Sequence, residues 1–348
     1  MELTTVWFVV LAFLWTGYFF LEGFDFGVGA LLPVLGRDDT ERRVLINTIG
    51  PVWDGNEVWV VAAVGATFAA FPEWYATLLS AFYLPMLLLL VALIVRALAF
   101  EYRGKRTDPG WQRRWDRCIV FGSVVPAFLW GFVFGNLLGG LPIDADGEFA
   151  GSLPDLFTVA GLLGGLTSLT LFVLHGAAFV ALKTHGEIRE RARALAGRVL
   201  LVTLVVAAVA LLFAQLGAGK PGTWVTAAGA LAALGAVGAV NARGREGWAF
   251  LGTGAAIVLA AVTLFALVFP AVVPSTLADA NSLTTTNAAA TPYTLKIMSW
   301  AALAFTPLVL LYQSFTYWVF RKRIGVRDIP PPAGAALAPR ASTSAGPR

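Results

Sequence analysis

Long apolar runs restrict what this chain can fold into more than any other feature of its sequence. Several runs exceed about 18 residues, which is the length that a helix needs to cross the hydrocarbon layer of a bilayer. Only 13% of the residues are charged, whereas about a quarter are charged in a typical soluble domain. The chain therefore has too few charged residues to form the polar surface of a soluble protein. The sequence predicts an all-α integral membrane protein.

We predict nine transmembrane helices in a single polytopic domain that covers residues 1–323. In the fourth span, Gly131, Gly135 and Gly139 recur every fourth residue and form one small-residue face for close helix packing. Residues 324–348 are rich in Pro and Ala, a composition typical of a disordered tail. The predicted spans are 6–33, 50–70, 77–100, 118–141, 156–182, 197–217, 223–241, 248–270 and 293–320.

Basic residues fall almost entirely on one side of these spans. Counting Arg96 at the inner end of the third span, 23 of the 25 lysines and arginines lie on that side. Only Lys220 and Lys296 lie on the other side. Cytoplasmic loops carry the excess of Lys and Arg in membrane proteins, so we expect the N-terminus outside and the C-terminus in the cytoplasm. This placement accounts for the net charge of +4 without a nucleic-acid partner.

Four carboxyl groups remain inside the predicted spans. An ionisable side chain in the hydrocarbon layer costs about 2.5–3.5 kcal/mol, so each is a candidate for function. Glu22 and Asp25 are three residues apart and share a face of the first span. Asp54 and Glu57 are related in the same way on the second span, and no basic residue is buried near the four acids in the sequence. If the two faces meet, the four carboxyls form a ladder.

The depths of these acids suggest a route for protons. A rise of about 1.5 Å per residue puts Asp25 roughly 12 Å from the inner end of the first span. Asp54 stands in the first turns of the second span, Glu57 is one turn deeper, and Glu22 is the deepest. We therefore predict a proton uptake path from the cytoplasm; the alternative is that the acids only fix helix packing. Without a histidine beside them, we expect no metal site.

Histidine and methionine are too scarce to hold several haems. Each haem needs axial His, Cys or Met ligands, and the chain has two histidines, one cysteine and three methionines. His185 lies in a charged connection, while His175 lies in the fifth span as a proton-path residue, a quinone contact or a packing residue. We expect any redox cofactor of this protein to be held mainly by another chain.

Two motifs of the sequence resemble subunit II of the cytochrome bd quinol oxidases of bacteria. The first runs from Glu22 to Gly29 in the first span, and the second runs from Trp53 to Trp59 at the start of the second span. The resemblance extends over essentially the whole chain to Arg323. Three further segments also fit the family, namely 36–43, 134–138 and 274–276.

This resemblance implies a partner and a reaction. Subunit II pairs with a similarly folded subunit I, which holds two b-type haems, one d-type haem and the quinol oxidation site. The heterodimer, in the bacterial cytoplasmic membrane and its lipid, oxidises quinol, reduces oxygen to water and contributes to the proton-motive force. Some members of the family hold a structural quinone in subunit II, and a small accessory subunit is left open.

The resemblance also assigns roles to the four acids. Asp54 matches an acid that the family assigns to a proton channel, and Asp25 matches a second member of the same route. Glu22 and Glu57 stand where the family tolerates Asp and Gln respectively, and a Gln carries no charge. Two alternatives stay open, namely a purely structural partner of the haem subunit and a proton-coupled secondary transporter, which would show an internal repeat.

Overall fold

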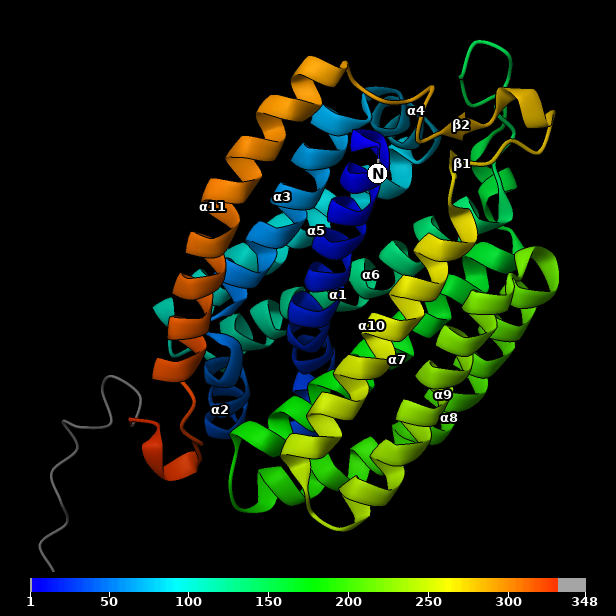
Figure 1. Ribbon diagram of the computed structural model, residues 1–348. Coiled ribbons are helices and arrows are strands. Elements are labelled where there is room, and N and C mark those ends of the chain that lie inside the picture. Colours follow the sequence, from blue (N-terminus) through cyan, green and yellow to red (C-terminus); the bar gives the residue numbers. More distant parts are fainter. Residues whose placement is uncertain (1, 331–348) are drawn as a thin grey trace, which may run out of the picture.

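Residues 2–330 of the computed structural model are described here, and they form a bundle of long helices around α1 (Leu3–Leu35) (Figure 1). The other long helices are α3 (Trp53–Ala70), α5 (Tyr83–Tyr102), α6 (Pro109–Gly139), α7 (Val159–Lys183), α8 (Glu187–Ala218), α9 (Pro221–Ala242), α10 (Glu246–Val268) and α11 (Pro292–Val319). The short elements are α2 (Asp39–Ile49), α4 (Pro72–Ala81), the 3-10 turns η1 (Arg103–Lys105), η2 (Leu153–Leu156), η3 (Asp279–Asn281) and η4 (Val326–Asp328), and the antiparallel strands β1 (Ala271–Val273) and β2 (Leu283–Thr284).

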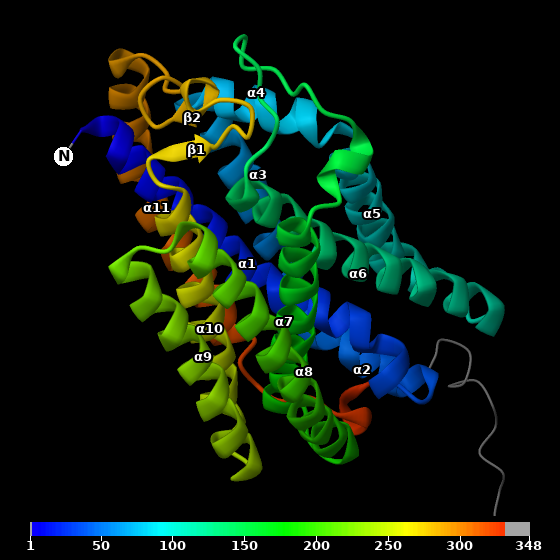
Figure 2. The same cartoon turned by 90° about the vertical axis from the view of Figure 1, so that its right-hand side faces the viewer.

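Helix α1 is the central element of the bundle. It packs against α3, α6, α7 and α10, and it runs between two groups of helices. In Figure 1, α3, α5 and α11 lie on one side of α1, and α7 to α10 lie on the other. The perpendicular view in Figure 2 shows α1 passing obliquely through the middle. Side chains in the middle of α1 are therefore shielded by neighbours from both groups.

Glycines allow the helices to approach this closely. A Cβ atom on Gly27 of α1 would collide with the backbone of Gly176 on α7. Between α6 and α7, a Cβ on Gly131 would collide with the carbonyl of Gly164, and one on Gly135 with the carbonyl of Ala160. The predicted small-residue face of the fourth span is thus confirmed, because it contacts α7 backbone to backbone.

The predicted spans have counterparts among the helices of the structure. Eight described helices are long and apolar enough to cross a membrane, and the pair α3 and α4 would bring the number to nine. These two helices meet at 119°, so α4 does not continue α3, which at 18 residues is about 27 Å long. The predicted third span began too early, inside α4, and α2 is a separate helix before the second span. The number of crossings itself stays a prediction.

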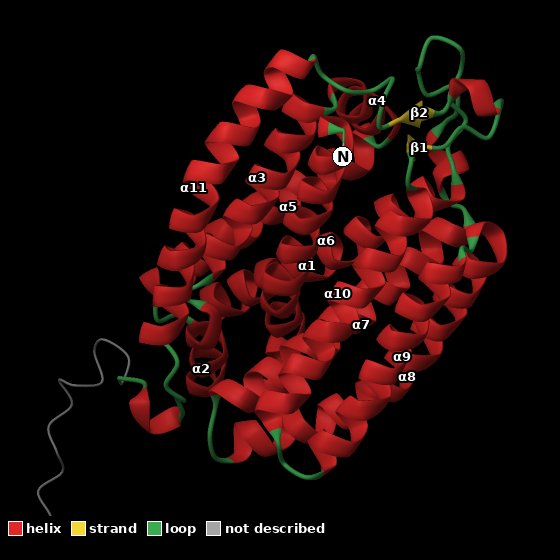
Figure 3. Cartoon of the chain, in the orientation of Figure 1, coloured by secondary structure: helices red, strands yellow, loops and turns green. Residues whose placement is uncertain are grey.

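Loops gather at the two ends of the bundle (Figure 3). Contacts at each end join connections that the sequence assigns to the same side of the membrane. At the predicted outer end, hydrogen bonds join the second connection to the fourth and eighth, through Thr77 to Gly147 and Ala290 to Ala70. At the other end, the ion pairs are Arg103–Asp39, Arg191–Glu41, Arg189–Glu246 and Arg323–Glu246. Which end faces the cytoplasm stays a prediction.

Residues 324–330, which the sequence placed in the tail, are folded against the end of α7. The amide of Ile324 donates to the carbonyl of Lys183 at 2.9 Å, and Asp328 contacts His185 at 3.2 Å. The rest of the predicted tail, 331–348, lies outside the described residues.

Candidate functional site

The two carboxyl groups of α1 lie at the centre of the bundle. Glu22 and Asp25 both have an exposed fraction of 0%. The glycines of the same motif explain this position, because Gly23 faces the ring of Phe172 and Gly27 faces the α7 backbone with no room for a Cβ. The motif from Glu22 to Gly29 therefore places the acids and also makes the close packing that buries them.

Arg96 of α5 pairs with Glu22, which corrects two expectations from the sequence. The guanidinium Nη1 donates to Glu22 Oε1, and both side chains are fully buried. Arg96 also lies over the rings of Phe26 and Phe100, at 4.8 and 5.3 Å from their centres. From the sequence, Arg96 is expected among the cytoplasmic charges, and no basic residue is expected near the acids. The sequence does not reveal this partner because Arg96 and Glu22 are 74 residues apart.

Asn56 of α3 joins Asp25 to the last long helix. Its Nδ2 donates to Asp25 Oδ2 at 2.6 Å, and its Oδ1 accepts from Tyr317 at 2.7 Å and from Gln313 at 3.1 Å. Trp59 donates to Oε1 of Gln313 at 2.7 Å. A continuous hydrogen-bonded chain thus runs from α1 through α3 to α11. Gln313 and Tyr317 were missed as members of this cluster because neither is charged.

Four buried polar atoms of this cluster have no hydrogen-bond partner among the described residues. They are Glu22 Oε2, Asp25 Oδ1, and Nε and Nη2 of Arg96. A buried carboxylate oxygen without a donor is costly unless it binds a proton, a water molecule or a group from another chain. Each acid therefore has one oxygen held by a donor and one oxygen without a donor among the described residues.

Asp54 and Glu57 form no hydrogen bond with this pair within residues 2–330. Asp54 is exposed in the first turn of α3, and Glu57 is half-buried one turn further on. Glu57 is nevertheless close enough to Glu22, Asp25 and Arg96 for their charges to interact. The predicted ladder of four carboxyls is thus not joined by direct hydrogen bonds, and Asp54 is its exposed member.

Comparisons with known proteins identify the family of the chain. Residues 3–320 match the family described as cytochrome bd terminal oxidase subunit II. This chain belongs to that family. A Bacillus subtilis protein named cytochrome bd ubiquinol oxidase subunit 2 is 42% identical over 94% of this chain and 98% of its own length. The Escherichia coli K12 protein named cytochrome bd-I ubiquinol oxidase subunit 2 is 36% identical, over 93% and 96%.

The fold is also that of a solved bd oxidase. A chain of the bd oxidase from Geobacillus thermodenitrificans superimposes with a TM-score of 0.76, at 18% identity, over 92% of this chain and all of that one. This protein is thus a terminal-oxidase subunit and a multi-pass protein of the bacterial inner membrane. Family membership favours the oxidase over the transporter alternative, and the name subunit II implies a partner subunit.

The histidines of this subunit II chain do not fit a haem. Both ring nitrogens of His175 are engaged, Nδ1 with Thr253 at 2.6 Å and Nε2 with the carbonyl of Phe20 at 3.2 Å. The ring stacks on Phe250 with centres 4.5 Å apart. Both ring nitrogens of His175 thus have partners within the described chain, whereas a haem ligand needs a free ring nitrogen.

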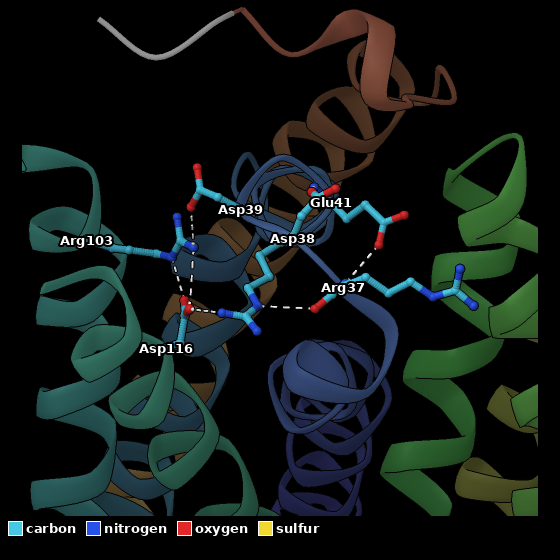
Figure 4. Close-up of polar contacts among 8 residues, drawn as sticks. Arg37, Asp38, Asp39, Glu41, Arg103 and Asp116 are labelled. Carbon is cyan, nitrogen blue, oxygen red and sulfur yellow. Dashed lines mark hydrogen bonds and ion pairs between the residues drawn. The ribbon is translucent and has the colours of Figure 1, made fainter. Parts of the chain in front are cut away.

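At the predicted cytoplasmic end of this subunit, α2 is held by buried charges (Figure 4). Asp38 caps α2 by accepting from the amide of Glu41 at 2.8 Å. Asp116 of α6 accepts from Arg103 at 2.5 Å and from Arg42 at 3.0 Å. The segment 36–43 thus folds into a clamp that ties the inner end of α1 to α5, α6 and α8.

Proposed function

We propose that this chain is the subunit of a quinol:dioxygen oxidoreductase that ligates no haem and conducts protons from the cytoplasm toward the haem subunit. Subunit I, the partner, is proposed to hold two b-type haems, one d-type haem and the quinol oxidation site. The observation that carries the proposal is the fully buried pair of acids on α1, each with one oxygen held and one left without a donor. Ionisable groups in the hydrocarbon layer are costly, and a purely supporting subunit has no need of an open carboxylate oxygen.

In this proposal the four acids have different tasks. Asp54, exposed in the first turn of α3, takes up protons from the cytoplasmic side. Glu57, one turn deeper and half-buried, extends the route, but its family tolerates Gln there and the route does not depend on it. Asp25 receives the proton at Oδ1 while Asn56 holds Oδ2 at 2.6 Å. Glu22 is the innermost acceptor, through Oε2.

Arg96 and Asn56 are proposed as positioning residues rather than carriers. Arg96 holds one oxygen of Glu22 and so fixes the carboxyl in one rotamer, with its other oxygen directed away. Asn56 does the same for Asp25, and its own orientation is fixed by Tyr317 and Gln313. The gap between Asp54 and Asp25 is bridged in the proposal by water or by side chains of subunit I.

An apolar cavity among the helices is a candidate site for a structural quinone. The cavity has a volume of about 150 Å³ and lies among α6, α7, α8, α9 and α10. Its lining includes Phe134, Phe172 and Leu264, with Ser168 and Thr263 as sources of hydroxyl groups. Both of these hydroxyls already donate to backbone carbonyls. The cavity therefore suits an isoprenoid or acyl chain better than a quinone ring.

The test is quinol-driven oxygen consumption by the purified heterodimer, with haem content recorded by optical spectrum. Wild type is compared with Asp25→Asn and with Asp54→Asn. The control is Asp146→Asn, which removes an exposed carboxyl at the predicted outer end. Proton uptake during a single turnover with oxygen is followed with a pH-indicator dye.

We expect full haem content in all variants, a collapse of turnover and of proton uptake in Asp25→Asn and Asp54→Asn, and no change in Asp146→Asn. If haem and turnover both survive in the two path variants, the chain is a structural partner only. If haem is lost together with turnover, the acids serve packing.

A further inference from the structure

A groove opens beside α1 and α6 at the predicted cytoplasmic end, away from the buried acids. Its volume is about 490 Å³. One part of its lining is charged, with Asp116 and the three arginines Arg42, Arg113 and Arg117. The other part is apolar and consists of Pro33, Val120, Phe121, Val124 and Val125. The groove therefore has a polar half and an apolar half.

The polar half carries positive charge that no carboxylate in the described chain offsets. Asp116 is already shared by Arg103 and Arg42, at 2.5 and 3.0 Å. Arg113 and Arg117 are exposed, and neither forms an ion pair within residues 2–330. They are four residues apart on α6, so their side chains lie on one face of the helix. Two guanidinium groups are thus available to one anion.

The apolar half continues toward the membrane interior. Val120, Phe121 and Val124 follow the arginines along α6, and Phe121 is 40% exposed. The sequence places the start of this span at 118, between the arginines and the valines. A molecule that fills the whole groove therefore needs an anionic group at the membrane surface and an apolar body below it.

We propose that this groove binds an anionic phospholipid of the cytoplasmic leaflet. Its phosphate lies between Arg113 and Arg117, and one acyl chain lies along Val120 and its apolar neighbours. Basic pockets between helices on the cytoplasmic side suit anionic head groups, and the guanidinium fork matches phosphate oxygens. A free phosphate ion satisfies the arginines but leaves the apolar wall uncovered, so the lipid is the occupant that fits both halves.

The site is tested on the purified heterodimer by native mass spectrometry with added dioleoylphosphatidylglycerol, and with dioleoylphosphatidylcholine as the zwitterionic comparison. The groove variant is Arg113→Gln/Arg117→Gln. The matched control, Arg114→Gln/Arg198→Gln, removes two exposed arginines that do not line the groove. The variant Arg113→Lys/Arg117→Lys keeps the charge, and haem content reports that each complex is intact.

Wild type and the control are expected to bind phosphatidylglycerol equally, and the groove variant about thirty-fold more weakly. This factor corresponds to about 1 kcal/mol for each arginine near an anionic lipid, with 1.4 kcal/mol per tenfold change. The lysine variant is expected to keep most of the affinity. An equal loss of phosphatidylglycerol affinity in the control and groove variants would overturn the site. So would an unchanged affinity in both. Full displacement by millimolar inorganic phosphate would show that the anion alone binds and that the lipid assignment is wrong.

Discussion

Removing the guanidinium of Arg96 alone should lower the stability of this protein more than removing the whole ion pair between Arg96 and Glu22. Both side chains are fully buried, so the variant Arg96→Leu leaves a carboxylate buried without its partner. Breaking a buried pair in this way costs about 3–5 kcal/mol, and the lost contacts with Phe26 and Phe100 add about 1 kcal/mol. The double variant Arg96→Leu/Glu22→Leu puts two apolar side chains into apolar surroundings and should fall within about 1–2 kcal/mol of wild type.

The assay is the thermal midpoint of the heterodimer in detergent, followed by size-exclusion chromatography. At roughly 2–4 °C per kcal/mol, the single variant should melt roughly 8–24 °C below wild type, and the double variant should recover most of that loss. Arg114→Leu, which removes an exposed arginine, is the control. An equal drop in thermal midpoint in the single and double variants would refute the pairing. A single variant destabilised by less than about 1 kcal/mol would refute it too. If Glu22 carries protons, the double variant regains stability but not turnover.

Three further predictions follow from other parts of the structure. Gly27→Ala should lower the thermal midpoint by the equivalent of about 1–3 kcal/mol, because its Cβ meets the α7 backbone, whereas Gly65→Ala, with nothing within 4 Å, should raise it slightly. Asp116→Asn should cost about 2–4 kcal/mol in the same assay, with little dependence on salt, because its partners are mostly buried. Hydrogen bonds from Ser152 hold the pKa of Asp155 below its ordinary value. The turn at Ser152 should therefore stay closed at neutral pH and open as pH falls through that lowered pKa, which hydrogen exchange at the Ser152 amide would detect.

The helical framework could be predicted from the sequence because bilayer thickness fixes the length of an apolar span. Each expected span has a long helix in the structure, although the number of membrane crossings stays a prediction, and the glycines of the fourth span pack as expected. The end of the second span at residue 70 was predicted, but the separate helix α4, which lies at 119° to α3, was missed, and the third span was begun inside it. Length and hydropathy carry no information on such a bend.

Only part of the candidate site could be predicted from the sequence. The acids were found because a carboxyl inside an apolar run is rare and costly. Arg96 was misplaced, although the ten apolar residues 86–95 precede it and four follow it. Its depth was judged from the predicted end of the span, and such a boundary shifts easily by a turn. Asn56, Gln313 and Tyr317 are neutral, so their importance depends on contacts between distant helices that no local pattern encodes.

The contacts of the polar cluster can form only in a certain order during synthesis of the chain. Glu22 and Arg96 both belong to the first third of the chain, so their pair can close while the ribosome is still translating and can ease insertion of an arginine into the hydrocarbon layer. The acceptor atom of Asn56 must wait for Gln313 and Tyr317 on the last long helix. Apart from Leu295, Gln313 is the only buried residue of that helix. The orientation of Asp25 through Asn56 is thus completed only when synthesis of the membrane domain ends, because the final long helix supplies both donors to Asn56.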